Sequence, residues 1–443
     1  MRKKNVLIFI MVIILILQGS LTQTVKAEQN KQSLTQTVKA EQNKQSLTQT
    51  VKAEQNKQSL TQTVKAEQNK QSTFFSSFIE MKLFGKFFKP VKVIPAGSYA
   101  ILAAFESTAI ESHGIVPEAV QTIDGPIRLS FAGDAMFDWS VKQTVKQKGP
   151  DYPFLHIKSE LASSDLNVVN LETSITTGGS KQNKQYTFRS DPQALTGLKN
   201  AGFQLVSLAN NHSLDFGQVG FTDTIANLKE YNIDYVGGGL NKEEAYSAKS
   251  YDIKGKTVKI LAFSRVLPDY SWVATDIKPG LANGYDIELI ENIIQKEKAD
   301  ADLLFVFIHW GVEKNRTPEP FQREWAQKMI ASGADGVIGS HPHVLQGFEY
   351  YKGKPIAYSL GNLLFPNYIR GNTAQTGILH LDIENDQIEM SFVPFRISQD
   401  QIIKQSNFEK SRVWKELQNL SYGELEIQNG RINDLTSVTN SND

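Results

Sequence analysis

Strand-like and helix-like segments alternate through the middle of the chain, from about Pro126 to about Arg396. Short apolar runs with the length of buried strands lie at 127–132, 167–170, 204–208, 258–263, 303–309, 336–338 and 355–360. Helical patterns lie between several of them, at 192–201, 220–231, 287–298 and 321–332. This alternation predicts an α/β domain with a largely parallel sheet and helices on both of its faces. Two later runs, at 378–383 and 388–392, have no helix between them and predict antiparallel edge strands.

The N-terminus has the three parts of a bacterial secretory signal. Basic residues at positions 2–4 precede an unbroken apolar run from Val6 to Leu17, and the small residue Ala27 follows. A membrane-spanning helix needs about 20 apolar residues, so this shorter run favours a cleaved signal over a retained anchor. We therefore expect residues 1–27 to direct export. The mature protein would be secreted, or lie at the outer face of the cell membrane or in the cell wall.

A 13-residue repeat begins within the last residues of the predicted signal and continues beyond it. The sequence SLTQTVKAEQNKQ at 20–32 recurs without change at 33–45, 46–58 and 59–71. Each copy has only Leu and Val as bulky apolar residues, which is too little apolar surface to offset the entropy of ordering the chain. We therefore expect a disordered linker over 28–72.

Two further segments flank the predicted domain. In the linker 73–125, the phenylalanines and lysines of 74–95 have helical spacing. This pattern predicts an amphipathic helix that lies either on a membrane surface or against the main domain. At the other end, we expect residues 401–443 to form a helical extension and tail.

Composition excludes several kinds of site. The chain contains no cysteine, which excludes disulfides, lipid attachment through a lipobox cysteine and thiolate metal ligands. Any metal would therefore be held by histidine nitrogens and by oxygen ligands. The 47 basic and 47 acidic residues balance, so the sequence shows no nucleic-acid-binding footprint.

Polar side chains follow five of the strand-like runs, where open α/β sheets bind their ligands. Asp134 follows the first run. Asn170 ends the second run and Glu172 follows it, so that in an extended chain these two side chains lie on the same face. Singly, such residues also cap ordinary turns. Asn210, Asn211 and His212 follow the third run, where their polar groups need partners. The set predicts a polar site at this edge of the sheet.

Histidines end the two remaining runs. His309 follows the fifth run, a position where a lone histidine is usually structural. His341 and His343 follow the sixth, separated by Pro342, which pushes His341 toward extended backbone. Two imidazoles at this spacing point the same way, which suits a divalent ion about 2.1 Å from each nitrogen. Together the five segments predict a divalent metal site.

These segments, in this order, resemble the CapA family of poly-γ-glutamate capsule biosynthesis proteins. The matching motifs are GDAM at 133–136, NLE at 170–172, ANNH at 209–212, HWG at 309–311, SHPHV at 340–344 and SLGN at 359–362. The resemblance covers about 127–395 and implies a domain over 126–400. The family is similar to calcineurin-like metallophosphatases, which implies a four-layer α/β/β/α sandwich with two metals at the strand ends.

The resemblance also implies a metal ligand set. The matching positions are Asp134 and His343 for the first metal, Glu172 as the bridging carboxylate, and Asn211, His309 and His341 for the second metal. In the broader phosphatases an aspartate stands where this chain has Glu172, and Asn170 is the alternative for that role. Those enzymes also have a histidine where this chain has Met136. We expect one or two divalent ions, of Zn, Mn or Fe.

The remaining implied roles concern catalysis and substrate. His212 matches the general acid that protonates a leaving oxygen, and we assign Asn210 and Asn362 to substrate binding. Gly237, Gly238 and Gly239 lack the spacing of a nucleotide-binding loop and indicate a permissive turn.

Three functions remain open at this stage. The first is an exported component of poly-γ-glutamate capsule or surface-polymer synthesis and export, acting as a metal-dependent hydrolase or transferase of the polymer or of a phosphorylated carrier. The second is a non-catalytic, polymer-binding export scaffold. The third is a secreted phosphoesterase of small phosphate esters. The expected partners are the polymer, membrane-bound capsule synthesis or export proteins and, peripherally, the membrane, with no nucleic acid.

The repeat linker gives a first testable prediction. Deleting two of the four repeats should leave the melting temperature of the protein unchanged, because the repeats offer too little apolar surface to pack on the domain. Proteases should also cut residues 20–71 much faster than the domain. Differential scanning calorimetry and limited proteolysis check this, and a lower melting temperature after the deletion would contradict it.

Overall fold

The computed structural model describes residues 125–436. The predicted signal segment, the repeat linker and the amphipathic helix predicted within 74–95 lie outside the described residues. Within the described range, no helix is both long and apolar enough to cross a membrane.

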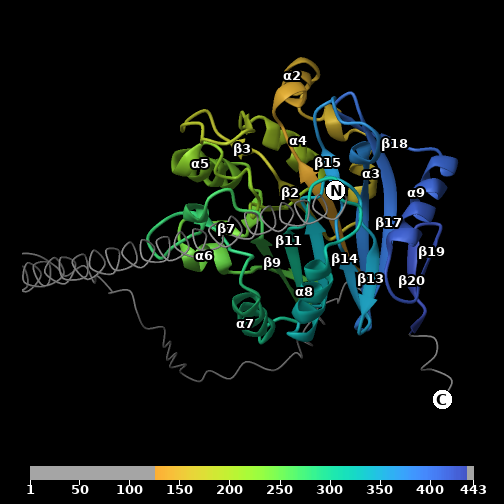
Figure 1. The fold of residues 1–443 in the computed structure, drawn as a ribbon. Coiled ribbons are helices and arrows are strands. Elements are labelled where there is room, and N and C mark those ends of the chain that lie inside the picture. The colour runs from red at the N-terminus through yellow and green to blue at the C-terminus, as the bar shows by residue number, and fades with distance from the viewer. Residues whose placement is uncertain (1–124, 437–443) are drawn as a thin grey trace, which may run out of the picture. The chain divides into compact units, whose positions relative to one another are not determined.

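The first of two large sheets has ten strands (Figure 1). Its order is β19-β20-β17-β16-β1-β2-β5-β6, with β15 also pairing with β1 and β18 with β17. Strands β1, β2, β5 and β6 are parallel, whereas β16 and β17 are antiparallel as the sequence predicted. The prediction that these two strands lie at the edge was wrong, because β16 pairs with β1 and β17 pairs with β20. The bounds are β1 Ile127–Ala135, β2 Leu166–Leu171, β5 Leu205–Ser207, β6 Asp234–Val236, β15 Asn362–Leu364, β16 Gln375–Glu384, β17 Gln387–Ser398, β18 Gln401–Lys404, β19 Leu425–Gln428 and β20 Arg431–Asp434.

The second sheet has six strands in the order β13-β14-β12-β11-β9-β8. Its central strands β9, β11, β12 and β14 are parallel, and β8 and β13 add antiparallel edges. The bounds are β8 Lys249–Ile253, β9 Lys256–Ser264, β11 Leu303–His309, β12 Gly336–Ser340, β13 Phe348–Tyr351 and β14 Lys354–Ala357.

Helices and short elements complete the domain. The helices are α2 Trp139–Lys148, α3 Lys158–Leu161, α4 Ala194–Ala201, α5 Gly217–Glu230, α6 Lys242–Tyr246, α7 Ile287–Lys298, α8 Pro320–Ala331 and α9 Asn407–Leu420, with 3-10 turns η2 Tyr152–Phe154, η3 Tyr270–Trp272 and η4 Gly371–Ala374. Two small two-stranded sheets pair β3 Ser174–Ile175 with β4 Arg189–Ser190, and β7 Gly238–Gly239 with β10 Gly280–Leu281.

Three apolar clusters define the layers. One lies between the two sheets, where Phe131 of β1 meets Phe305 and Phe307 of β11, with ring centroids 6.2 and 6.1 Å apart. A second joins the outer face of the first sheet to helices α2 to α5, and a third joins the outer face of the second sheet to α7 and α8. This is the expected four-layer α/β/β/α sandwich.

The layering corrects one part of the sequence interpretation. The alternation of strands and helices predicted one largely parallel sheet with helices on both faces. Instead there are two sheets, with helices α2 to α5 on the outer face of the first and α7 and α8 on the outer face of the second. Strands such as β1 and β11 are buried on both faces, because the inner face of each sheet packs against the other sheet rather than against helices.

The C-terminal segment does more than extend the domain with a helix. Helix α9 forms where helix was expected, and a capping box of Ser406 and Glu409 begins it. However, β18, β19 and β20 join the first sheet through β17, and Leu417 of α9 is buried in the cluster between the sheets. The described part of 401–443 is therefore an edge of the sandwich.

Gly133 lets β1 lie unusually close to the loop before β15. A Cβ atom built on Gly133 would lie 1.9 Å from the carbonyl oxygen of Gly361. That same oxygen accepts a hydrogen bond from the backbone N–H of Asp134 at 2.9 Å. The absence of a side chain at Gly133 thus fixes the end of β1 against the 360–362 loop.

We predict that Gly133→Ala destabilises the domain by roughly 2 kcal/mol or more, because the new methyl group would overlap a backbone carbonyl that cannot move alone. As a control, a Cβ on Gly178 would meet only side-chain atoms, of which the nearest is Oδ2 of Asp223 at 3.0 Å. Gly178→Ala should therefore cost less than about 1 kcal/mol. Urea denaturation of both variants measures the difference, and equal stabilities would refute this account of Gly133.

Candidate metal centre

The polar residues predicted from the sequence meet where the carboxyl ends of the two sheets adjoin. Asp134 lies near the end of β1, opposite Asn170 of β2, and Glu172 directly follows β2. His309 ends β11, opposite Ser340 of β12. The other members of the set, Asn211, His212, His341 and His343, lie in the loops after β5 and β12. Each sheet thus contributes residues to one cluster.

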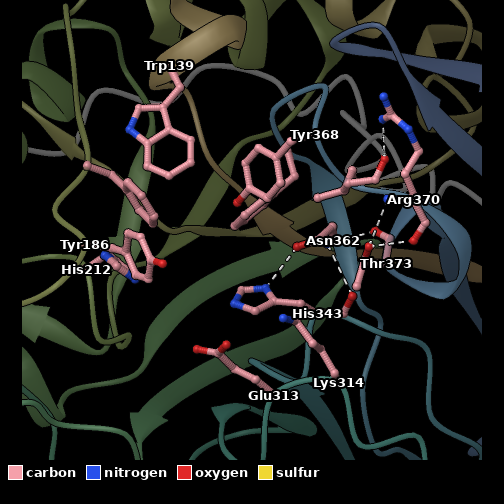
Figure 2. A pocket seen from close by; sticks show the side chains of 13 residues that line it. Trp139, Tyr186, His212, Glu313, Lys314, His343, Asn362, Tyr368, Arg370 and Thr373 are labelled. Carbon is pink, nitrogen blue, oxygen red and sulfur yellow. Dashed lines mark hydrogen bonds between the residues drawn. The ribbon is translucent and has the colours of Figure 1, made fainter.

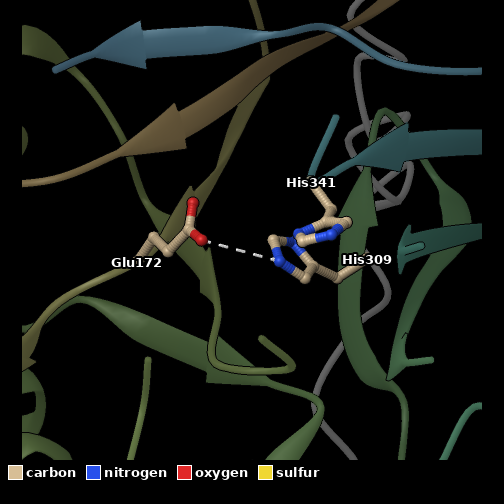
Figure 3. A group of neighbouring side chains, drawn as sticks. All are labelled: Glu172, His309 and His341. Atoms are coloured by element: carbon tan, nitrogen blue, oxygen red, sulfur yellow. Dashed lines mark ion pairs between the residues drawn. The ribbon is translucent and has the colours of Figure 1, made fainter. Parts of the chain in front are cut away.

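Glu172 lies at the centre of the cluster. Its Oε1 atom is 3.6 Å from Nε2 of His309, 3.8 Å from Nε2 of His343 and 4.0 Å from Nε2 of His212. The side chain is fully buried, and neither carboxylate oxygen has a hydrogen-bond partner. Figure 3 shows Glu172 facing the imidazoles of His309 and His341. A buried carboxylate without hydrogen-bond donors remains charged only if a positive charge lies nearby.

Two overlapping groups of side chains have ligand atoms within 4.8 Å of one another: Glu172, His309 and His341, and Asp134, Glu172 and His343. Glu172 belongs to both, which is the arrangement of a bridging carboxylate. The buried Nδ1 atom of His341 also has no hydrogen-bond partner. Nitrogen and carboxylate donors left open in this way fit a divalent ion such as Zn, Mn or Fe.

Hydrogen bonds orient the remaining members of the set. Asp134 accepts from the side-chain amide of Asn170 at 2.8 Å and from the backbone N–H of His341 at 3.1 Å. The Oδ1 atom of Asn211 lies 2.9 Å from Nε2 of His309. Asn170, the alternative to Glu172 in the sequence interpretation, is thus a hydrogen-bonded neighbour of Asp134.

Burial controls the charge of the cluster. Burial and then Asp134 raise the pKa of Glu172 well above its ordinary value. Burial and the neighbouring imidazoles lower the pKa of His309 far below its ordinary value, and that of His341 to about 3. Burial opposes protonation of His343 as well, but Glu172 and Asp134 raise its pKa to about 9. Two imidazoles are thus held neutral, the form that binds a metal.

Met136 offers no nitrogen ligand to the cluster. It is fully buried in an apolar group with Phe188, Phe365 and Ile369. Its sulfur accepts a hydrogen bond from the backbone N–H of Asp138 at 3.1 Å. The group of Asp134, Glu172 and His343 therefore has no imidazole from this position.

His212 faces the cluster from the side, held by an aspartate. Its Nδ1 atom lies 2.6 Å from Oδ2 of Asp215, and its ring stacks on Phe188 with centroids 4.1 Å apart. The other ring nitrogen, Nε2, is the atom directed toward Glu172. A carboxylate that accepts from Nδ1 fixes the position and orientation of the ring. Burial lowers the pKa of His212 and Asp215 opposes this, so His212 has the geometry of a proton donor through Nε2 when both ring nitrogens are protonated.

Sequence reasoning assigned no role to the residues that support His212. Asp215 also accepts hydrogen bonds from the ammonium of Lys184 at 2.7 Å and from the backbone N–H of Phe188 at 2.6 Å. The spacing of Asp215, three residues after His212, was a usable signal. Lys184 and Phe188 lie in an irregular loop without any sequence pattern, and only the fold brings them here.

The two residues assigned to substrate lie in different places. Asn362 borders a cavity beside the cluster, and its Oδ1 atom is 2.9 Å from Nδ1 of His343. Asn210 is fully buried and does not line that cavity. Its amide donates to Asn170 and Leu171, and its Oδ1 accepts from the backbone of His212. In the structure, Asn210 thus braces the loop that carries His212.

The cavity has a volume of about 490 Å³, and His212 and His343 open into it (Figure 2). Aromatic side chains form one wall, and the ring centroids of Trp139 and Tyr368 are 5.3 Å apart. Burial, then Glu172 and Glu313, raise the pKa of Tyr368 to about 12, so its hydroxyl keeps its proton. The lining residues are Trp139, Tyr186, Phe188, His212, Glu313, Lys314, His343, Asn362, Phe365, Tyr368, Ile369, Arg370 and Thr373.

We predict that the protein purified without chelator contains at least one equivalent of Zn, Mn or Fe. The double variant His341→Ala, His343→Ala should lose it, because the change removes one imidazole from each ligand group. Elemental analysis by mass spectrometry measures the bound metal. His156→Ala is the matched control, since His156 is exposed and outside the cluster. A metal-free wild-type protein whose stability is unchanged by EDTA would contradict the site.

Solved structures with partial similarity include a metal-dependent phosphatase. A hypothetical protein from Thermus thermophilus is 16% identical with a TM-score of 0.39, covering 61% of this chain and 99% of that one. A dimetal phosphatase from Danio rerio is 10% identical with a TM-score of 0.30, covering 54% of this chain and 98% of that one.

Sequence comparison identifies closer relatives. Capsule biosynthesis protein CapA of Bacillus anthracis is 33% identical over 334 residues, covering 73% of this chain and 80% of that protein. PGA biosynthesis protein CapA of Bacillus subtilis strain 168 is 32% identical over 252 residues, covering 56% of this chain and 66% of that protein. The family model described as bacterial capsule synthesis protein PGA_cap matches residues 128–367, more than half of the chain. The chain therefore belongs to the PGA_cap family of bacterial capsule synthesis proteins.

Proposed function

We propose that this protein is an exported, metal-dependent hydrolase that takes part in the synthesis of a poly-γ-glutamate capsule. One observation carries the hydrolase assignment: the buried, unpartnered carboxylate of Glu172 and the Nε2 atom of His212 face the same space. The named relatives, which include a PGA biosynthesis protein, support the assignment of poly-γ-glutamate as the polymer. The predicted secretory signal supports a place at the outer face of the cell membrane or in the cell wall.

The residues of the cluster divide into two roles. Asp134, Glu172, Asn211, His309, His341 and His343 would hold the ion or ions. When bound, divalent metal polarises the oxygen of a carbonyl or phosphoryl group and lowers the pKa of bound water to about 7. Glu172 and Asp134 supply negative charge that offsets the charge of the metal. Their burial keeps the electrostatic interactions strong.

His212 acts on the leaving group. Asp215 accepts from Nδ1 of His212, so the ring can give a proton from Nε2 to a leaving oxygen or nitrogen in the cavity when it is doubly protonated, a form that Asp215 stabilises. Phe188 covers one face of the ring and limits its rotation. Lys184 donates to Asp215 and holds that carboxylate in place. The chain itself thus provides an oriented acid next to the ligand cluster.

A non-catalytic, polymer-binding scaffold is the second candidate. Met136 favours it, because this buried thioether stands where the broader phosphatases have an imidazole. A site with fewer ligands would bind one ion, and the fold could then serve the polymer without turnover. The two candidates differ in what they require of His212.

We predict that His212→Ala keeps its metal and its melting temperature but loses hydrolysis by about a hundredfold or more, because the general acid is removed and the ligands remain. The assay follows cleavage of poly-γ-glutamate and, in parallel, of a chromogenic phosphate ester. His309→Ala should instead lose metal, and His156→Ala should match the wild type. Capsule output in cells that depend on this gene is the second readout. Full hydrolysis and capsule output by His212→Ala would favour the scaffold.

A further inference from the structure

A second cavity opens beside the metal-site cavity. It has a volume of about 400 Å³ and shares two lining residues, Ile369 and Arg370, with the first. From there it extends to the turn that joins β17 to β18. Its lining residues are Asn367, Ile369, Arg370, Ala374, Arg396, Ile397, Ser398 and Gln399. The two cavities adjoin at these shared residues, and we call the second cavity the arginine groove.

The arginine groove has positive charge and no acidic lining residue. Within residues 125–436, neither Arg370 nor Arg396 forms an ion pair, whereas Arg128, Arg316, Arg323 and Arg431 all do. The Nη1 atom of Arg370 donates to the backbone carbonyls of Asn367 and Ile369, which holds the guanidinium in place. Two neighbouring arginines without acidic partners repel each other, so an anionic ligand would stabilise both.

Glu313 lines the adjoining metal-site cavity and not the arginine groove. Two other acidic residues close to the groove are engaged elsewhere. Asp400 follows the groove residue Gln399 in the chain, but its carboxylate accepts hydrogen bonds from Ser140 and Thr144 of α2 at 2.6 and 2.8 Å. Glu409 accepts hydrogen bonds from Ser406 at the start of α9, and these lower its pKa more than Arg396 does. The charge of the groove is therefore available to a ligand.

We propose that the arginine groove binds successive carboxylates of a γ-linked glutamate chain while the chain's reacting bond lies at the metal cluster. This inference rests on the proposed function. Each residue of such a chain carries one carboxylate, which matches the planar donor fork of a guanidinium. The methylene groups between carboxylates match the apolar lining side chains Ile369 and Ile397. This combination favours a polymer with apolar spacers over a phosphate polymer.

The test measures binding of a fluorescent poly-γ-glutamate oligomer to the full chain by anisotropy, at two salt concentrations. Arg370→Gln and Arg396→Gln should each weaken binding roughly tenfold and reduce its salt dependence, because each removes a charged hydrogen-bond donor from the groove. Arg431→Gln is the matched control and should bind within about twofold of the wild type, since Arg431 lies on β20 in an ion pair with Glu389. Melting temperature and metal content verify that every variant is folded.

Competition identifies the ligand. Unlabelled poly-γ-glutamate should displace the probe better than poly-α-glutamate or polyphosphate of equal charge. Equal competition by all three, or equal weakening by Arg431→Gln, would overturn the proposal and indicate nonspecific attraction of polyanions. Unchanged binding by Arg370→Gln and Arg396→Gln would overturn it as well. Because binding needs no turnover, a protein that fails to hydrolyse the polymer still gives a decisive result here.

Discussion

The carboxylate of Glu172 is the constraint on which the site depends. It is buried where the two sheets adjoin, three imidazole nitrogens lie within 4.0 Å of it, and no donor satisfies either of its oxygens. Such a group is costly in a protein unless a cation accompanies it. In the absence of metal, protonated His343 offsets part of this charge, but a protonated imidazole cannot bind a metal ion. The cluster therefore has the electrostatics of a site completed by a divalent ion.

The sandwich explains how distant residues reach Glu172. Parallel strands β1 and β2 of one sheet and β11 and β12 of the other end at the same place, because the inner faces of the sheets pack through Phe131 and Phe305. The close approach of Gly133 to Gly361 brings the loop with Asn362 against β1. The packing between the sheets thus also sets the geometry of the site, and a shift between the sheets would separate the ligands.

Much of this was predictable because the informative signals are local. Apolar runs of strand length predicted β1, β2, β5, β9, β11 and β12. The polar residues at the ends of these strands, except β9, predicted the cluster around Glu172. The pattern of strands and helices did not predict the two-sheet layering. A strand buried on both faces has the same apolar sequence whether it packs against helices or against another sheet. Asn210 was assigned to substrate, whereas in the structure its side-chain amide holds the loop that carries His212. Lys184 and Arg396 carry no local pattern, and only tertiary structure reveals their neighbours.

The central claim is that Glu172 is a metal ligand shared by two groups of side chains. Anomalous X-ray diffraction from crystals of the purified protein, collected on both sides of the absorption edge of the metal found in it, tests this directly. We predict an anomalous peak about 2.1 Å from Glu172 and from the imidazole nitrogens of His309 and His341, and, if two ions bind, a second peak beside Asp134 and His343. Well-ordered crystals of metal-containing protein with every peak away from Glu172 would contradict the account.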